Sequence, residues 1–443
     1  MRMRACVLAA ALCLAAVPLF AQTTLTSQER RIREVIAASR EDQVAYLQRV
    51  VDIPSSTLNV DGVRRVGSVF QASLDSLGFT TTWVSVPGEM RRAGHLLAEH
   101  RGRAGNVRIL LIGHFDTVVE PAGANFARED SMARAVGGGD MKGGDVVILY
   151  ALKALQAAGA LRDLNVIAVF TGDEEYPGEP LAAARAALID AGHRSDVALA
   201  FEGGSRSIAT VARRGSSGWR LTATGRQAHS AGVFGRGAGY GANYELARIL
   251  DAFRQQLAGE QYLTFNAATM VGGTDVTWDT GQVSGTASGK TNIVPRLALA
   301  AGDLRFMTQE QLERTRERMR QIVAQHLPGT DAQIDFEDGY PAMPLTPGNQ
   351  RLLTFYDEAS RALGYGAVAA MDPGMRGAGD LSFVAPFTDG LEGLGALGSG
   401  AHTPAERVNL NALPMQTERA ALMLARLGPH QASEFARPSG AGR

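Results

Sequence analysis

Residues 107–118 read VRILLIGHFDTV, an apolar run followed at once by a histidine and an acid two positions apart. A strand that is apolar on both sides is typical of the centre of a parallel sheet, where helices cover both faces. We therefore predict a buried central strand over residues 107–112. His114 and Asp116 follow it at the carboxyl end, where functional residues gather in open α/β sheets.

Helices and strands alternate on both sides of this strand. Helical patterns cover residues 26–51, 61–77, 143–158 and 181–191, and strands are expected at 80–86, 95–99, 165–170 and 197–201. This order predicts an α/β fold with a mostly parallel sheet flanked by helices.

The pattern changes between residues 215 and 328, where a strand, a helix, strands and a second helix follow one another. A stretch of about 110 residues suffices for a separate domain, so we predict an inserted α+β domain of the ferredoxin-like type. Helices at 350–363 and 414–427 return to the first sheet. The first domain is therefore expected to be discontinuous, over 22–214 and 329–432, with a flexible tail over 433–443.

The first 21 residues have the form of an export signal. Arg2 and Arg4 precede an apolar run over residues 5–16, and a small-residue cleavage site follows Ala21. An uncleaved membrane anchor is the alternative, because Leu19 is a poor residue three positions before the cut. The run is too short to span a bilayer. We expect an exported protein, periplasmic or secreted, with no stable membrane insertion after cleavage.

Composition limits the partners and the chemistry. The full chain of 443 residues has 44 basic and 45 acidic side chains, so a nucleic-acid partner is not expected. Both cysteines, Cys6 and Cys13, lie in the signal segment. The mature chain would then have no disulfide and no thiolate ligand, and any metal site must use histidines and carboxylates.

Three residues near the central strand are candidates for a metal site. Residues two apart in an extended segment project to the same side, so His114 can bind a metal while Asp116 orients its ring. A satisfied polar pair is the alternative. Asp140 lies in GGGDMKGG (137–144), where glycines allow close approach to a ligand, although on this segment alone a helix N-cap is the better explanation.

Four more candidates follow later strands or turns. Glu174 and Glu175 end the string TGDEE (171–175), where three acids are costly to crowd together unless they face solvent or a cation. Glu202 begins EGG after the strand at 197–201, and His402 lies in GSGAHTPAE (398–406). Together these nitrogen and oxygen donors suit zinc or a related divalent ion, and also a pair of ions bridged by one carboxylate.

The order of these strings resembles a known family. The strings are GHFDTV, GGGDMKGG, TGDEE, FEGG, RQAHSAG (226–232), KTNIVP (290–295), DLRF (303–306) and GAHTPAE. In this order they are similar to those of the co-catalytic zinc metallopeptidases, the family of glutamate carboxypeptidase, aminoacylase and related dipeptidases. The resemblance covers residues 50–430 and is closest to the glutamate carboxypeptidase-like members.

The resemblance implies two zinc ions per chain, with Co²⁺ or Mn²⁺ as other candidates. Asp140 would bridge the two ions together with a water molecule. One ion would also take His114 and Glu202, and the other Glu175 and His402.

The resemblance also implies catalytic and substrate-binding residues. Asp116 would orient His114, and Glu174 would be the general base that activates the bridging water. The inserted domain would serve as a lid and as the contact of a homodimer, with His229 reaching the partner's active site. Asn292 and Arg305 would contact the substrate. Read without the resemblance, His229 is a turn histidine and Arg305 a charge on an edge strand.

Two departures from the family pattern bear on the substrate. Residues 338–344 read DGYPAMP and offer no arginine, which leaves selectivity for a glutamate side chain open. In GAGDLSF (377–383), Gly379 stands where family members have serine or threonine before the acid, here Asp380.

The main hypothesis is a zinc-dependent exopeptidase of the carboxypeptidase type that hydrolyses an amide bond next to a free carboxylate. Its substrate would be a small peptide. The first alternative is an aminoacylase acting on N-acyl amino acids, and a panel of both substrate types would separate the two. The more distant alternative is a non-catalytic binding protein with the same fold, which would lack turnover.

Overall fold

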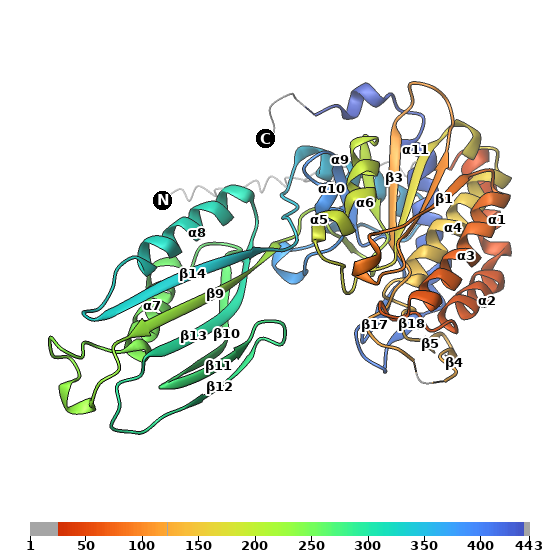
Figure 1. Cartoon of the computed structure of the whole chain (residues 1–443). Coiled ribbons are helices and arrows are strands. Elements are labelled where there is room, and N and C mark those ends of the chain that lie inside the picture. Colours follow the sequence, from red (N-terminus) through yellow and green to blue (C-terminus); the bar gives the residue numbers. More distant parts are fainter. Residues whose placement is uncertain (1–24, 122, 438–443) are drawn as a thin grey trace, which may run out of the picture.

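The computed structural model describes residues 25–121 and 123–437 (Figure 1). The expected signal segment lies outside these residues. Within them, two bodies each have their own sheet and their own apolar core. In the described ranges, no helix combines the length and the apolar character needed to cross a membrane.

The larger body is built on a six-stranded sheet in the order β1-β2-β6-β3-β7-β16. The strands are β1 (Thr80–Val84), β2 (His95–His100), β3 (Arg108–His114), β6 (Asn165–Thr171), β7 (Val197–Ala200) and β16 (Asp389–Glu392). Strand β2 runs antiparallel to the other five strands, which all run in one direction. The expected mostly parallel sheet is confirmed.

The central strand β3 is covered on both faces, which is why its sequence is apolar without alternation. Ile109 and Leu111 belong to one core, whereas Leu110 and Ile112 belong to another on the opposite face. The helices of the first face are α1 (Ser27–Ala38), α2 (Arg40–Val51), α3 (Val60–Ser76), α4 (Lys142–Ala157), α9 (Pro347–Ala362) and α11 (Ala412–Leu427), and those of the second are α5 (Leu181–Ala184), α6 (Ala186–His193) and α10 (Leu381–Val384). The single helix expected over 26–51 is two helices, α1 and α2, that meet at Ser39.

The second body is a four-stranded antiparallel sheet in the order β10-β13-β9-β14, with two helices packed on it. The sheet and its helices consist of β9 (Gly215–Gly225), α7 (Ala242–Leu257), β10 (Thr264–Gly273), β13 (Leu297–Phe306), α8 (Gln309–Val323) and β14 (Thr330–Asp338). A separate hairpin of β11 (Asp275–Asp279) and β12 (Ser284–Ser288) is inserted between β10 and β13. Apart from this hairpin, the βαββαβ order is the expected ferredoxin-like pattern. Strand β14 pairs along β9, from Thr330 opposite Gly225 to Asp338 opposite Ser217. The sheet therefore extends beyond the boundary expected at residue 328.

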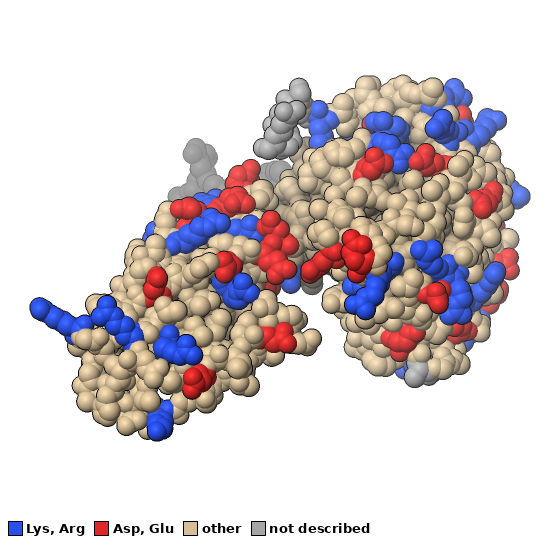
Figure 2. All heavy atoms as spheres, in the orientation of Figure 1, with Lys and Arg blue, Asp and Glu red and all other residues tan. Residues whose placement is uncertain are grey.

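Two antiparallel segments join the bodies, residues 210–216 leading out and 339–346 leading back (Figure 1). Arg213 and Met343 exchange two backbone hydrogen bonds of 2.9 Å, and the Ser216 N–H donates to the Tyr340 carbonyl at 2.9 Å. We call this pair of segments the hinge. On the face seen in Figure 2, basic and acidic side chains are interspersed over both bodies.

The chain end expected to be a flexible tail from residue 433 is packed as far as residue 437. Phe435 is buried in the main core, and the Arg437 guanidinium donates to the Asp389 carboxylate at 2.8 Å. These two anchors correct the expectation for 433–437. Residues 438–443 lie outside the described ranges.

Candidate active site

Five potential metal ligands meet at the carboxyl edge of the first sheet. His114 ends β3, while Glu175 and Glu202 lie just beyond β6 and β7. Asp140 lies in the glycine-rich turn before α4. His402 lies in the turn between two short strands, β17 (Gly398–Ser399) and β18 (Arg407–Asn409), which form a small sheet with β5 (Met132–Arg134) and β4 (Ala127–Glu129). The fold thus brings together side chains that are far apart in sequence.

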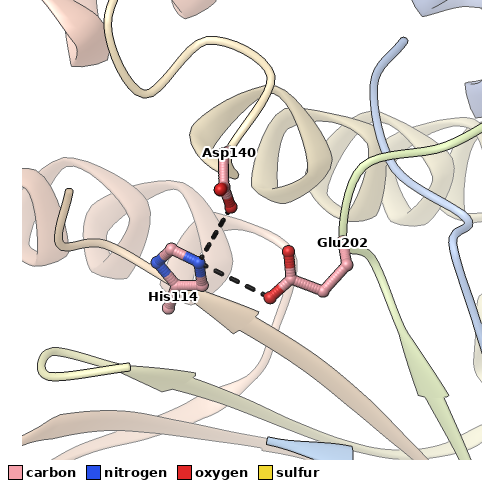
Figure 3. A group of neighbouring side chains, drawn as sticks. All are labelled: His114, Asp140 and Glu202. Atoms are coloured by element: carbon pink, nitrogen blue, oxygen red, sulfur yellow. Dashed lines mark ion pairs between the residues drawn. The ribbon is translucent and has the colours of Figure 1, made fainter. Parts of the chain in front are cut away.

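The ligands form two groups that share Asp140. The His114 Nε2 atom lies 3.5 Å from Asp140 Oδ1 and 3.5 Å from Glu202 Oε1 (Figure 3). The His402 Nε2 atom lies 3.1 Å from Asp140 Oδ2 and 3.3 Å from Glu175 Oε2. Each oxygen of Asp140 therefore faces a different group, as a bridging carboxylate requires.

These distances fit zinc. Zinc binds histidine nitrogens and carboxylate oxygens at about 2.0–2.2 Å, which places two ligands of a tetrahedral ion about 3.3–3.5 Å apart. His114 Nε2 is buried and has no hydrogen-bond partner among the described residues. A buried nitrogen without a partner is costly unless something binds it. A divalent cation in the first group would bind the His114 Nε2 atom. A cation in each group would also balance the negative charge of the carboxylates.

The acidity of the ligands reflects their crowding. Burial, followed by the charge of Asp140, raises the pKa of Glu202 to about 8. Burial also raises the pKa of Glu175 to about 7. For Asp140, burial acts in the same direction, but the nearby rings of His114 and His402 outweigh it and hold its pKa below the usual range. Without a cation, two of the three carboxyls therefore resist ionisation near neutral pH.

Zinc affinity is expected to rise steeply between about pH 5.5 and pH 8. At the lower pH, Glu175 and Glu202 are protonated in the metal-free protein and must release protons to bind zinc. An acid whose pKa is raised by folding also makes the metal-free protein less stable as the pH rises, because the folded state then binds more protons than the unfolded state. Zinc should thus raise the melting temperature more at about pH 8 than at about pH 5.5.

Thermal denaturation with and without zinc at both pH values checks this expectation. A hydrogen bond to Asp140 raises the pKa of His402 to about 9. Like the two acids, His402 therefore makes the metal-free protein less stable as the pH rises. Burial lowers the pKa of His95, so this residue makes the protein more stable as the pH rises. A zinc-induced shift that is equal at both pH values, or larger at the lower one, would refute the assigned ligands.

Asp116 connects His114 to the turn that carries the adjacent acids. The His114 Nδ1 atom lies 3.0 Å from the backbone carbonyl of Asp116 and 3.4 Å from its carboxylate. The carboxylate itself accepts the N–H groups of Glu174 at 3.0 Å and Glu175 at 3.1 Å, and the Thr57 hydroxyl at 2.6 Å. The closest group to the ring is therefore the backbone of Asp116, and its carboxylate mainly holds the turn.

Glu174 lies beside the ligands. Donor atoms of His114, Glu174 and Glu175 can all lie within 4.8 Å of one another. Burial first, and then the negative charge of Asp380, hold the pKa of Glu174 well above its usual range. A carboxyl with a raised pKa suits proton transfer near neutral pH.

Glu406 is a residue of this site that the sequence analysis did not single out. Its buried carboxylate accepts three backbone N–H groups, those of Gly137 at 2.7 Å, Gly139 at 2.8 Å and Asp140 at 2.9 Å. Glu406 belongs to the same turn as His402 and thus ties that turn to the loop of Asp140. The sequence pointed to Glu406 only by its place in the string GAHTPAE, where it is a possible metal ligand besides His402.

Changing Glu406 to glutamine is expected to lower zinc affinity by about 10- to 100-fold, as for other groups that support metal ligands. Glutamine keeps one acceptor oxygen but presents an NH₂ group to at least one N–H donor. Zinc competition with a chelator measures the change. Glu434→Gln is the matched control, because Glu434 accepts the backbone N–H of Gln431 at 2.9 Å in an exposed turn. Equal zinc affinity in the two variants would show that Glu406 does not position Asp140.

The three residues expected on the lid belong to the second body, in the part of the chain from β9 to β13, whereas the ligand cluster lies at the edge of the first sheet. His229 and Asn292 are exposed neighbours, since the N–H of Ser230 donates to the Asn292 carbonyl at 2.8 Å. Arg305 lies near the hinge end of β13, where its guanidinium donates to Asp303 at 2.8 Å. None of the three is among the groups of ligand atoms within the described chain.

The structure accounts for glycine at position 379. The buried Arg213 guanidinium donates to the carbonyls of Gly377 at 2.6 Å and Ala378 at 2.7 Å and pairs with Glu392. A Cβ atom on Gly379 would lie 2.2 Å from Arg213 Nη1. The serine or threonine of the family pattern therefore has no room here, because a hinge arginine fills the space.

Comparison with known proteins identifies the family of the chain and similar enzymes. Residues 110–426 match peptidase family M20/M25/M40. Carboxypeptidase G2 from Pseudomonas sp. (strain RS-16) is 26% identical over 416 residues, which cover 90% of this chain and 93% of that protein. Succinyl-diaminopimelate desuccinylase from Acidiphilium cryptum (strain JF-5) is 27% identical over 387 residues, covering 84% and 95%.

The fold is also found among solved structures. Aminopeptidase PepT from Bacillus cereus superposes with a TM-score of 0.72 at 17% identity, covering 88% of this chain and 98% of that one. The match to the family extends over most of the chain and includes all five candidate ligands. The chain belongs to peptidase family M20/M25/M40.

Proposed function

We propose that the protein is a two-zinc exopeptidase of the carboxypeptidase type, which hydrolyses an amide bond next to a free carboxylate. The observation that carries this proposal is the pair of ligand groups that share Asp140, with Glu174 beside them. The similarity to carboxypeptidase G2 supports the choice of reaction. The same nitrogen and oxygen donors also accept Co²⁺ or Mn²⁺.

When bound, the zinc ions would polarise the substrate carbonyl and lower the pKa of a water molecule. Glu174 accepts the proton of the attacking water and then transfers it to the departing amine. The Asp116 carboxylate accepts the backbone N–H of Glu174, so Glu174 keeps its position while it accepts the proton and while it releases it. Burial of the site strengthens these electrostatic interactions.

The proposal includes a homodimer. His229 is exposed on the second body, between β9 and α7, and is in none of the potential ligand groups of the described residues. In a homodimer, His229 of the partner subunit would stabilise the negative charge that develops on the carbonyl oxygen. Asn292, next to His229, and Arg305 would bind the substrate, with the Arg305 guanidinium suited to a carboxylate. Export from the cytoplasm is proposed on the sequence of residues 1–21 alone.

An aminoacylase is the second candidate, and one observation favours it. The similar desuccinylase is, by its name, an enzyme that removes an acyl group.

Paired substrates test the proposal. Dipeptides and N-acyl amino acids are assayed with zinc, each as the free acid and as the C-terminal amide. We expect hydrolysis of the free acids, with little or none of the amides, because the carboxylate anchors the substrate. The preferred group of free acids decides between peptidase and acylase. Equal hydrolysis of acids and amides would refute the requirement for a free carboxylate.

A further inference from the structure

The backbone around Glu174 is held from two sides. On one side, its N–H donates to the Asp116 carboxylate at 3.0 Å. On the other, its carbonyl accepts the hydroxyl of Tyr340 at 3.0 Å. Asp116 lies next to the metal ligands, but Tyr340 comes from the hinge, where the chain returns from the second body. Tyr340 is in none of the potential ligand groups of the described residues, so the second anchor reaches Glu174 from outside the ligand cluster.

Tyr340 is itself fixed by its surroundings. Its ring packs on Phe383 with centroids 4.9 Å apart, and its backbone N–H donates to the Ser216 hydroxyl at 3.3 Å. The Tyr340 hydroxyl also accepts from Arg185 Nη2 at 3.4 Å. The hydroxyl thus accepts one hydrogen bond, from Arg185, and donates its single proton to the carbonyl of Glu174.

Arg185 holds the residue before Glu174. Its fully buried guanidinium donates to the Asp173 carboxylate at 2.7 Å and to the Asp173 backbone carbonyl at 3.1 Å. It also donates to the Asp380 carboxylate at 2.7 Å, and Asp380 in turn accepts the Thr171 hydroxyl at 2.7 Å. Arg185 thus holds the turn after β6 at two kinds of group: the carboxylate of Asp173 and the backbone carbonyl of Asp173.

The network of Arg185, Asp173 and Asp380 contributes little to the free energy of folding. A buried arginine between two carboxylates adds little net stability compared with apolar residues of the same volume, because all three charges lose their hydration. Here the charged groups surround one short turn, residues 171–174, and engage its backbone. What they provide is a fixed position for that turn.

We propose that Tyr340 and Arg185 are positioning residues for the general base Glu174: they fix the peptide unit on which its carboxylate is mounted. This inference rests on the proposed function. It assigns a role to the hinge segment 339–346 that differs from connecting the two bodies. It also explains what the tyrosine does in the segment where the family pattern led us to look for an arginine.

The central variant is Tyr340→Phe, which removes only the hydroxyl. We expect kcat to fall by about 10- to 100-fold, because a base displaced by a fraction of an ångström transfers protons poorly. KM and the zinc content should stay at the wild-type values. Tyr150→Phe is the matched control, since the Tyr150 hydroxyl donates to the backbone carbonyl of Asp42 at 2.9 Å, far from the turn in sequence and outside the network. It should leave kcat unchanged.

Two further measurements separate positioning from stability. Arg185→Lys keeps the charge and should lower kcat less than Arg185→Met, if both fold. Hydrogen exchange at the amides of Glu174 and Glu175 should be about 5-fold faster in Tyr340→Phe than in the wild type, the effect of losing one hydrogen bond in the turn. This exchange measurement does not require a substrate.

The outcomes are distinct. If the zinc-loaded wild type is active and Tyr340→Phe matches Tyr150→Phe in kcat, the positioning role is refuted and the proposed function stands. Loss of zinc from Tyr340→Phe would also refute it, in favour of a role in building the metal site. If the wild type hydrolyses no substrate of either class, the proposed function fails, and unchanged amide exchange would then refute the positioning of the turn as well.

Discussion

Replacing Glu174 by glutamine is expected to lower kcat by about 10³-fold while both zinc ions stay bound. Glutamine has the same shape but cannot accept a proton from the attacking water. The five proposed metal ligands are other residues, and the Glu174 N–H that Asp116 accepts belongs to the backbone, so the site should keep its geometry. Steady-state kinetics and elemental analysis of the same preparation measure the two effects.

Glu179→Gln is the control for this variant. Glu179 is an exposed glutamate in the same loop and takes no part in the ligand groups. Its substitution should leave both kcat and zinc content at the wild-type level. Activity of Glu174→Gln close to that of the control would mean that another group is the base. Loss of zinc with activity would instead assign Glu174 to the ligands.

Asp140→Ala is expected to remove both activity and tightly bound metal. Each oxygen of Asp140 faces one of the two histidines, so this one substitution takes a ligand from both groups. The remaining pairs, His114 with Glu202 and His402 with Glu175, supply only two ligands each. Since zinc sites use three or four protein ligands, we expect less than about one zinc per chain and a loss of activity of at least about 10³-fold.

The matched control is Asp251→Ala, which removes an exposed carboxylate on α7. Both variants are compared after dialysis against a weak chelator, with circular dichroism to verify folding. Asp140→Ala that keeps two zinc ions would contradict the bridging geometry. Retention of one tightly bound ion would show that one group binds without the shared carboxylate.

The parts of the fold that follow from local pattern could be predicted from the sequence. The apolar run at 109–112, before His114, placed β3 at the centre of the sheet, because a strand covered on both faces is apolar without alternation. The acids and histidines that follow successive strands then had to meet at one edge. The structure brings His114, Asp140, Glu175, Glu202 and His402 together, as the order of the strings suggested.

Features that depend on distant partners could not be predicted. Strand β14 reads TDAQIDFED, too polar to stand out, and becomes a strand because β9 supplies its hydrogen bonds. Arg185 lies in the alanine-rich string LAAARAAL, where its spacing resembles that of a surface residue. Only the approach of Asp173 and Asp380 makes its burial tolerable. Phe435 shows the same limit at the chain end, since its burial depends on the core that it meets.

The two-zinc mechanism can be tested by elemental analysis of the purified protein, together with hydrolysis of free-acid dipeptides and N-acyl amino acids before and after chelation. We expect about two zinc ions per chain, cleavage that is lost on chelation, and recovery of cleavage when zinc is returned. A protein that binds no metal and cleaves none of these substrates would contradict this mechanism and would favour the non-catalytic binding protein.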